Sequence, residues 1–233
     1  MASHSAEVVS TPDVMAEAGG RLAEALRDVM YESELVRLAI PGGSALAALS
    51  FARGELGAEF ERVQLTWVDE RCVDVADAES NRGAAERAGL LGPVHPPRQI
   101  VPLFLDGETQ ADAVARSRDE LHASFDSALD VALLGLGEDG HIASLFPGQL
   151  DRDDEATVLA VCDSPKPPAR RISLGWRMLE TARVCLVAAA GESKRAAVAG
   201  TLAGDARLPA VGLHGLVVIS DVGPNPSSKG ASS

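Results

Sequence analysis

The stretch LDVALLGLGEDGHIASLFPG, Leu129 to Gly148, decides the fold. It opens with an apolar run that ends in a glycine-rich turn. Continuous apolar character is typical of a strand buried on both faces of a parallel sheet. The turn carries Glu138, Asp139 and His141 before the chain returns to apolar residues. Carboxylates beside a histidine at such a place indicate acid–base chemistry rather than a solvated loop.

Outward from this strand, the spacing of apolar residues predicts strands that alternate with helices. Strands are expected at 35–40, 63–69, 99–104, 129–137, 157–162, 170–175, 182–191 and 216–220. Helices are expected at 12–33, 44–53, 80–91, 109–125, 176–181 and 192–202, the first of them with Thr11 as its N-cap. This order predicts an α/β fold, a single three-layer Rossmann-like domain with a mainly parallel sheet. We expect one catalytic domain over 1–223 and a disordered Pro/Ser/Gly-rich tail over 224–233.

Composition narrows the class of protein. The chain has 233 residues, 46% of them hydrophobic, so it can bury a sizeable core. Its formal net charge of -13 disfavours binding to nucleic acid or to an anionic membrane. Cys72, Cys162 and Cys185 form no CxxC pair, which is typical of reduced thiols. Because we find no secretory signal and no apolar run of roughly 20 residues, we expect a soluble, cytoplasmic protein.

Four polar turns follow predicted strands: PGGS, VDERC, GEDGH and AAGESK. Right-handed crossovers would bring them to one edge of the sheet, where ligands bind in such folds. In PGGS, Gly42 and Gly43 expose main-chain N–H groups at the start of a helix, and Ser44 adds a hydroxyl donor. The turn is neither a GxxxxGK[ST] phosphate loop nor a GxGxxG fingerprint, so an anion site and an ordinary turn both stay open.

The turn VDERC sets an arginine beside two carboxylates. Asp69, Glu70 and Arg71 form either a local ion-pair cluster or an arginine held in place to stabilise a developing negative charge. His141 can take and return a proton near neutral pH, and Asp139 or Glu138 would orient its ring. A lone histidine is often structural, but its place at the ligand edge of the sheet favours catalysis.

Two further segments, the AAGESK turn and the loop DSPKPPA, have cationic side chains in or next to them. Lys194 lies in the first turn of a predicted helix, where the helix dipole disfavours a cation unless an anion binds there. Arg170 and Arg171 follow a loop whose prolines limit the entropy lost on ordering. We expect one of these two arginines to be solvated surface.

With these segments in view, the chain resembles the 6-phosphogluconolactonases, a family related in fold to the glucosamine-6-phosphate deaminases. GLGEDGHIASLFPG matches the family signature G-x-G-x-D-G-H-x-A-S-L-F-P-G at every defined position. VDERCVDVADAESNRG, DSPKPPARRISLG and AAAGESKRAAV resemble three further family segments, in the family's order over about 11–220. The first loop departs from the pattern: GGSAL stands where many relatives have GGSTP, so Ala45 lacks a hydroxyl donor.

The resemblance implies hydrolysis of 6-phospho-D-glucono-1,5-lactone to 6-phosphogluconate, the second step of the oxidative pentose phosphate pathway. It implies His141 as general base and Arg71 as the group that stabilises the tetrahedral oxyanion. Asp69 and Asp139 would orient these two side chains or contact sugar hydroxyls. The resemblance implies a phosphate clamp made of Gly42, Gly43, Ser44, Arg171 and Lys194. By its place in the family pattern, Arg171 is preferred over Arg170.

The substrate class sets what else is expected. A lactone is already activated towards hydrolysis, so we expect no cofactor. We also expect no metal, because no two of the five histidines have HxxxH spacing. The expected partner is the sugar phosphate lactone, without nucleic acid or membrane. A monomer is expected because no exposed apolar helix is evident.

Two alternatives share this fold. A sugar-phosphate isomerase/deaminase would follow the histidine with a segment resembling IAFNEPG, whose glutamate assists ring opening. Here the segment is IASLFPG, which has no carboxylate. A non-catalytic sugar-phosphate sensor would carry a helix-turn-helix, and we expect none because the sequence has no basic N-terminal module.

Overall fold

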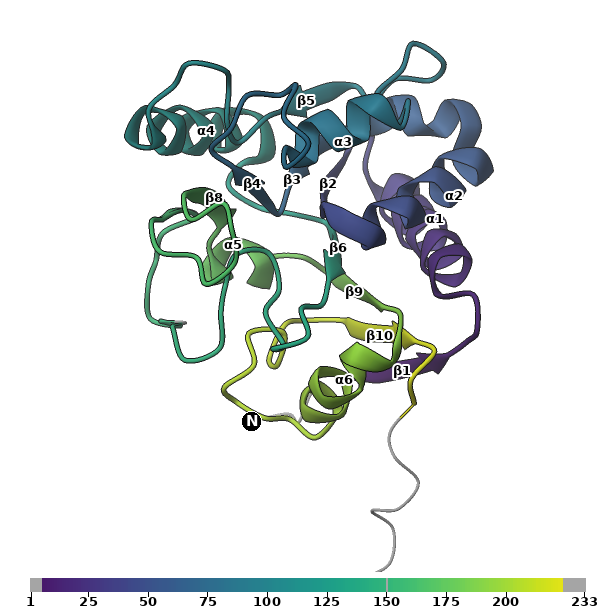
Figure 1. The fold of residues 1–233 in the computed structure, drawn as a ribbon. Coiled ribbons are helices and arrows are strands. Elements are labelled where there is room, and N and C mark those ends of the chain that lie inside the picture. The colour runs from purple at the N-terminus through teal and green to yellow at the C-terminus, as the bar shows by residue number, and fades with distance from the viewer. Residues whose placement is uncertain (1–5, 150, 224–233) are drawn as a thin grey trace, which may run out of the picture.

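The structure is a computed structural model that describes residues 6–149 and 151–223 (Figure 1). Seven strands form the central sheet in the order β1-β10-β9-β6-β2-β3-β5, and every neighbouring pair is parallel. Their bounds are β1 Glu7–Ser10, β2 Val36–Ile40, β3 Val63–Trp67, β5 Gln99–Val101, β6 Val131–Gly135, β9 Val184–Ala189 and β10 Leu216–Ser220. The mainly parallel sheet predicted from the sequence is confirmed. The tail expected over 224–233 lies outside the described residues.

Helices cover both faces of this sheet. The α-helices of the described chain are α1 Val14–Glu32, α2 Ala47–Leu56, α3 Asn81–Arg87, α4 Gln110–Phe125, α5 Trp176–Glu180 and α6 Arg195–Leu202. Short 3-10 helices are η1 Gly43–Leu46, η2 Gly57–Arg62 and η3 Glu192–Lys194. In Figure 1, α1 and α2 lie on one side of the central strands, and α5 lies on the other. Among the described residues, no helix is long and apolar enough to cross a membrane.

A second sheet of three antiparallel strands has the order β4-β8-β7, with β4 at Asp69–Arg71, β8 at Arg171–Leu174 and β7 at Val158–Val161. The single strand expected over 63–69 is therefore wrong: β3 ends at Trp67, and after Val68 the chain enters a different sheet. An apolar run that passes into charged residues carries no sign of such a change. The division matters because it pairs β4 with β8 and sets Arg71 opposite Arg171.

The N-terminal boundary also differs from expectation. Asp13, not Thr11, is the N-cap of α1, and its side chain accepts a hydrogen bond from the Ala16 amide at 3.3 Å. The strand β1 was not predicted. It is a short edge strand that pairs only with β10, and three of its four residues are exposed, so the sequence gives it no burial pattern.

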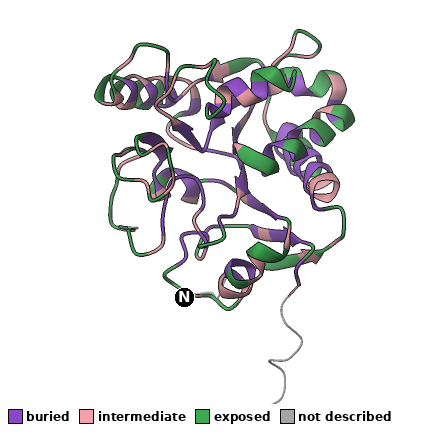
Figure 2. Cartoon of the chain, in the orientation of Figure 1, coloured by how far each residue is buried: buried purple, intermediate pink, exposed green. Residues whose placement is uncertain are grey.

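The core lies between the central sheet and its helices, as the purple ribbon in Figure 2 shows. Val131, Ala132, Leu133 and Leu134 of β6 are completely buried. The apolar run that opens the decisive stretch is thus a strand with both faces covered, as predicted. The rigid centre of the fold leads directly into the turn that carries His141.

Candidate active site

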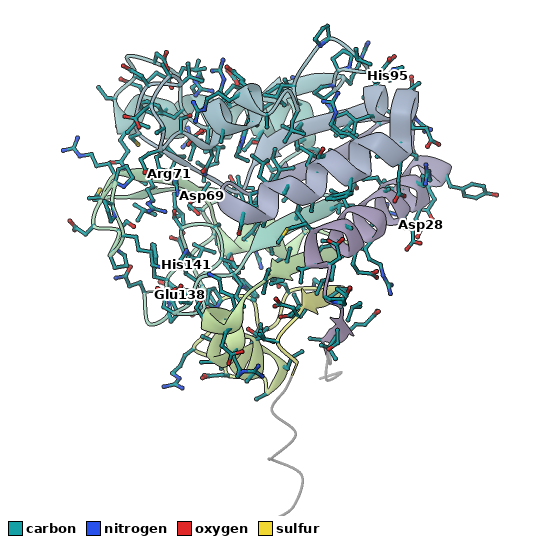
Figure 3. The ribbon with its side chains drawn as sticks, turned by 45° about the vertical axis from the view of Figure 1, so that its right-hand side comes forward. Asp28, Asp69, Arg71, His95, Glu138 and His141 are labelled. Atoms are coloured by element: carbon teal, nitrogen blue, oxygen red, sulfur yellow. The ribbon has the colours of Figure 1, made fainter. Side chains whose placement is uncertain are left out.

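One pocket, of about 260 Å³, lies where the carboxyl ends of β2, β3, β6 and β9 meet. Its size suits one small ligand, and its place is the ligand edge of a parallel sheet. The expected site residues that line it are Gly42, Gly43, Ser44, Asp69, Arg71, His141, Arg171 and Lys194. Residues of all four polar turns therefore converge, as predicted. Figure 3 shows Asp69, Arg71 and His141 on the same side of the molecule, away from Asp28 and His95.

The pocket has a positive lining although the chain is strongly acidic. Arg71, Lys166, Arg171 and Lys194 contribute four cationic side chains. Asp69 is the one carboxylate among the lining residues that the structure describes. An anionic ligand is therefore attracted locally, whatever the net charge of the whole protein.

His141 pairs with Asp139 within the same turn. Nδ1 of His141 lies 2.6 Å from Oδ1 of Asp139, while Glu138 is exposed beside them (Figure 3). His141 borders the pocket but Asp139 does not, so the carboxylate supports the ring from behind. The Phe146 ring packs on the imidazole with centroids 4.8 Å apart. The Nδ1 contact leaves Nε2 as the nitrogen for proton transfer.

Burial and neighbouring charges set the titration of this pair. Burial lowers the pKa of His141 below its ordinary value, because it outweighs the opposing effect of Asp139. Burial opposes ionisation of Asp139, but its hydrogen bond with His141 prevails and lowers the pKa of Asp139. At neutral pH the site therefore holds a neutral imidazole and an ionised carboxylate. This is the state that a general base requires.

Asp69 belongs to a buried network. Its Oδ2 accepts a hydrogen bond from the Ser144 hydroxyl at 2.6 Å and lies 3.7 Å from Nη1 of Arg171. Asn81 donates to both the main-chain oxygen of Asp69, at 2.8 Å, and Oδ1, at 3.3 Å. The partners of Asp69 are these three side chains and not Arg71, so of its two expected roles the contact with sugar hydroxyls stays a prediction.

Arg71 is held instead by the loop that follows it. Its Nη1 donates to the main-chain oxygen of Glu79 and lies 3.6 Å from the Glu79 carboxylate. Glu70 closes this loop from inside: its buried carboxylate accepts from the amides of Arg71, Asn81 and Arg82 at 2.7–2.8 Å. Because β4 is thereby tied to the start of α3, Arg71 and Asn81 reach the same pocket.

Arg171 has a different environment from the one expected. It is buried, and Nε donates to the Pro168 oxygen at 3.1 Å. Nη2 donates to the oxygens of Lys166 and Pro167 at 3.0 and 3.2 Å. Most of its donors therefore hold a loop, and only the Nη1 side approaches Asp69 and the pocket. Arg170 is exposed and does not line the pocket.

The first loop packs directly on the start of α3. A Cβ atom on Gly42 would lie 1.8 Å from Oδ1 of Asn81, so only glycine allows this approach. Gly43 and Ser44 then begin η1, which runs into α2, and both residues line the pocket. Lys194 is the N-cap residue of α6 and also lines the pocket. The loop and the lysine together offer an anion site.

Three residues of the site were not singled out from the sequence: Asn81, Ser144 and Lys166. Ser144 and Asn81 bind Asp69 across 75 and 12 residues of sequence, a relation that spacing cannot reveal. Lys166 had a usable signal, because lysines are rare in this chain and this one precedes two prolines. Within the described residues, no group of three His, Cys, Asp or Glu side chains could hold a metal ion.

Comparisons with known proteins identify the family of the chain. The family model described as glucosamine-6-phosphate isomerases/6-phosphogluconolactonase matches residues 10–218. A 6-phosphogluconolactonase from Mycobacterium leprae is 34% identical over 230 residues, which cover 92% of this chain and 93% of the relative. One from Streptomyces coelicolor is 36% identical over 223 residues, covering 87% and 85%.

Solved structures show the same fold. A 6-phosphogluconolactonase from Trypanosoma brucei superposes with a TM-score of 0.75 at 23% identity, covering 93% of this chain and 97% of that one. A monomeric glucosamine-6-phosphate deaminase superposes with a TM-score of 0.72 at 18% identity, covering 92% and 96%. The expected deaminase-like architecture is therefore confirmed. The chain belongs to the family of glucosamine-6-phosphate isomerases and 6-phosphogluconolactonases.

Proposed function

We propose that this protein hydrolyses 6-phospho-D-glucono-1,5-lactone to 6-phosphogluconate. The observation that carries the proposal is the pairing of His141 with Asp139, at 2.6 Å, on the edge of a pocket with four cationic side chains. The names of the relatives from Mycobacterium leprae and Streptomyces coelicolor support the same reaction. A neutral histidine can act as the base in ester hydrolysis, and the cationic lining beside it can bind the phosphate group of the same substrate.

In the proposed mechanism, His141 removes a proton from a water molecule that attacks the lactone carbonyl carbon. The new C–O bond converts the carbonyl oxygen into a tetrahedral oxyanion, which the Arg71 guanidinium stabilises. The bond from this carbon to the ring oxygen then breaks, and the imidazolium returns its proton to the ring oxygen. Asp139 keeps Nδ1 protonated and the ring aligned throughout. The product is an open-chain acid, and His141 is neutral again.

The phosphate end of the substrate is assigned to the other side of the pocket. The main-chain N–H groups of Gly42 and Gly43, the Ser44 hydroxyl and the Lys194 ammonium would bind it. The Nη1 edge of Arg171 supports this clamp, while its other donors hold the neighbouring loop. Asp69 also lines the pocket and would contact the sugar hydroxyl groups.

The nearest alternative is a sugar-phosphate isomerase or deaminase. Those enzymes would carry a glutamate in the segment after the histidine, as in IAFNEPG. In this chain Phe146 stands at the place of that glutamate, and its buried ring packs on the imidazole. An apolar ring cannot exchange a proton, so lactone hydrolysis is favoured.

A coupled assay tests the proposal. Glucose-6-phosphate dehydrogenase generates the lactone in situ at mildly acidic pH, and 6-phosphogluconate dehydrogenase reports the product. We expect the protein to accelerate hydrolysis and His141→Ala to lose roughly 10²–10⁴-fold in rate. His122→Ala, which changes an exposed histidine on α4, is the matched control. Deamination of glucosamine 6-phosphate without lactone hydrolysis would overturn the proposal.

A further inference from the structure

We propose that Lys166 is a catalytic residue whose ammonium group contacts the reacting end of the lactone and stabilises the oxyanion together with Arg71. The inference rests on the proposed function and assigns a second cation to its chemical step. Lys166 lies in the loop before β8, close to Asp139 and far along the chain from every other lining residue except Arg171.

The main chain at Lys166 is fixed on both sides. The Ser164 hydroxyl donates to the Lys166 oxygen at 2.8 Å, and the Lys166 amide donates back to the same hydroxyl at 3.3 Å. Nη2 of Arg171 donates to the oxygens of Lys166 and Pro167, and Nε donates to the oxygen of Pro168. A buried arginine thus makes three hydrogen bonds to the loop that carries Lys166. The main chain from which the lysine side chain extends is therefore held rigid.

The Lys166 side chain lines the pocket beside His141. Its Nζ lies 3.8 Å from Oδ1 of Asp139, the same oxygen that is 2.6 Å from the His141 ring. This separation is an ion pair without a hydrogen bond, and no other described group accepts from Nζ. The Lys166 side chain is 44% exposed, and its ammonium keeps its donors for a ligand. Because it shares a carboxylate oxygen with His141, it stands at the end of the pocket where the proton transfer occurs.

The charges around His141 give this lysine a second effect. Burial lowers the pKa of His141, Asp139 and Asp69 raise it, and Lys166 lowers it. Removing the ammonium therefore removes an influence that keeps the imidazole neutral. The acid limb of kcat/KM reports the pKa of the base in the free enzyme, so it should move to higher pH. The shift of this limb reports the charge beside the base, while a fall in kcat reports the contact with the oxyanion.

A phosphate ligand is the competing role for Lys166. Its position argues against that role, because Nζ lies beside the carboxylate that holds His141, at the end of the pocket where the proton transfer occurs. Lys194 has no such carboxylate in contact among the described residues and is the last residue of η3. The two lysines are therefore assigned to opposite ends of the substrate, and this division can be measured.

The experiment compares Lys166→Met and Lys166→Arg with the wild type in the coupled lactonase assay across pH. Lys166→Met keeps the aliphatic stem, and we expect its kcat to fall roughly 10²-fold with KM changed less than about threefold. We also expect its acid limb to move to higher pH. Lys166→Arg should recover part of the rate. Arg170→Met, which removes an exposed cation from the same segment outside the pocket, should match the wild type.

The possible results separate the roles. An unchanged kcat and acid limb in Lys166→Met would overturn the proposal, as would a loss confined to KM, which would make Lys166 a phosphate ligand. Equal thermal unfolding midpoints for wild type and variant exclude misfolding as the cause of a loss. Failure of the proposed function gives a distinct result, since the wild type itself would then show no lactone hydrolysis.

Discussion

Oδ1 of Asp139 lies 2.6 Å from Nδ1 of His141, and both atoms occupy the space that a side chain at position 137 would need. The turn closes through hydrogen bonds from the Gly137 amide to the His141 oxygen at 2.8 Å and from the Gly140 amide to the Gly137 oxygen at 3.0 Å. The end of β6 therefore positions the base and its carboxylate as one unit. Rigid placement of this kind is what general-base catalysis requires.

The first prediction concerns Gly137. A Cβ atom there would lie 2.0 Å from Nδ1 of His141 and 2.4 Å from Oδ1 of Asp139, so Gly137→Ala must displace the pair. We expect kcat to fall about 10²-fold or more because the base loses its alignment. Steady-state kinetics in the coupled assay measure the effect.

Gly54→Ala is the matched control, since a Cβ on this exposed glycine of α2 would meet open space. It should keep full activity and raise helix stability by up to about 1 kcal/mol. Full activity in Gly137→Ala would show that the His141–Asp139 contact does not limit the reaction.

The second prediction concerns the pH dependence of Asp139→Asn. The Asp139 carboxylate stabilises the charged imidazolium and thereby raises the pKa of His141, against the lowering caused by burial. Neutralising it should lower that pKa further, so the acid limb of kcat/KM moves to lower pH. The rate on the plateau should fall roughly 10²–10⁴-fold, because the ring loses its preferred tautomer.

Glu138→Gln changes the adjacent exposed carboxylate and should leave both the limb and the plateau unchanged. A limb in Asp139→Asn that moves to higher pH would contradict the assignment of His141 as the titrating base. The opposite shift expected for Lys166→Met makes the two variants an internal comparison.

Much of this architecture could be predicted because it depends on local patterns. The buried strand β6 follows from its apolar run. The convergence of the polar turns follows from the handedness of parallel crossovers. Within the site, His141 and Asp139 are two residues apart in the chain, so their pairing could be predicted from the sequence.

What could not be predicted depends on contacts between distant segments. The change of sheet at Val68 gives Asp69 the partners Ser144 and Arg171 in place of Arg71. Burial decides the role of Arg171, because its donors turn to the oxygens of its own loop. Neither pairing across sheets nor burial of a charged side chain has a signature in local spacing. These contacts and this burial become visible only in the folded structure.

The third prediction tests the assignment of the phosphate end. Lys194→Met removes the cation at the start of α6 that lines the pocket. A charge-assisted contact of about 1.5–3 kcal/mol corresponds to a rise of roughly 10- to 100-fold in KM, with a smaller change in kcat. Arg195→Met is the matched control, because this neighbour forms an ion pair with Glu192 and does not line the pocket. Equal effects of the two substitutions would contradict a specific phosphate contact.

The fourth prediction concerns the stability of the buried network around Asp69. The Ser144 hydroxyl donates to Asp69 Oδ2 at 2.6 Å and accepts from Nη1 of Arg171 at 3.4 Å, with all three side chains buried. Ser144→Ala leaves a buried carboxylate without its shortest hydrogen bond, which should lower the free energy of unfolding by about 1–3 kcal/mol. Denaturant titration should show a lower midpoint at an unchanged slope. Ser50→Ala, at an exposed position of α2, should change stability by less than about 0.5 kcal/mol. Equal midpoints for Ser144→Ala and the wild type would mean that Arg171 alone compensates the Asp69 charge.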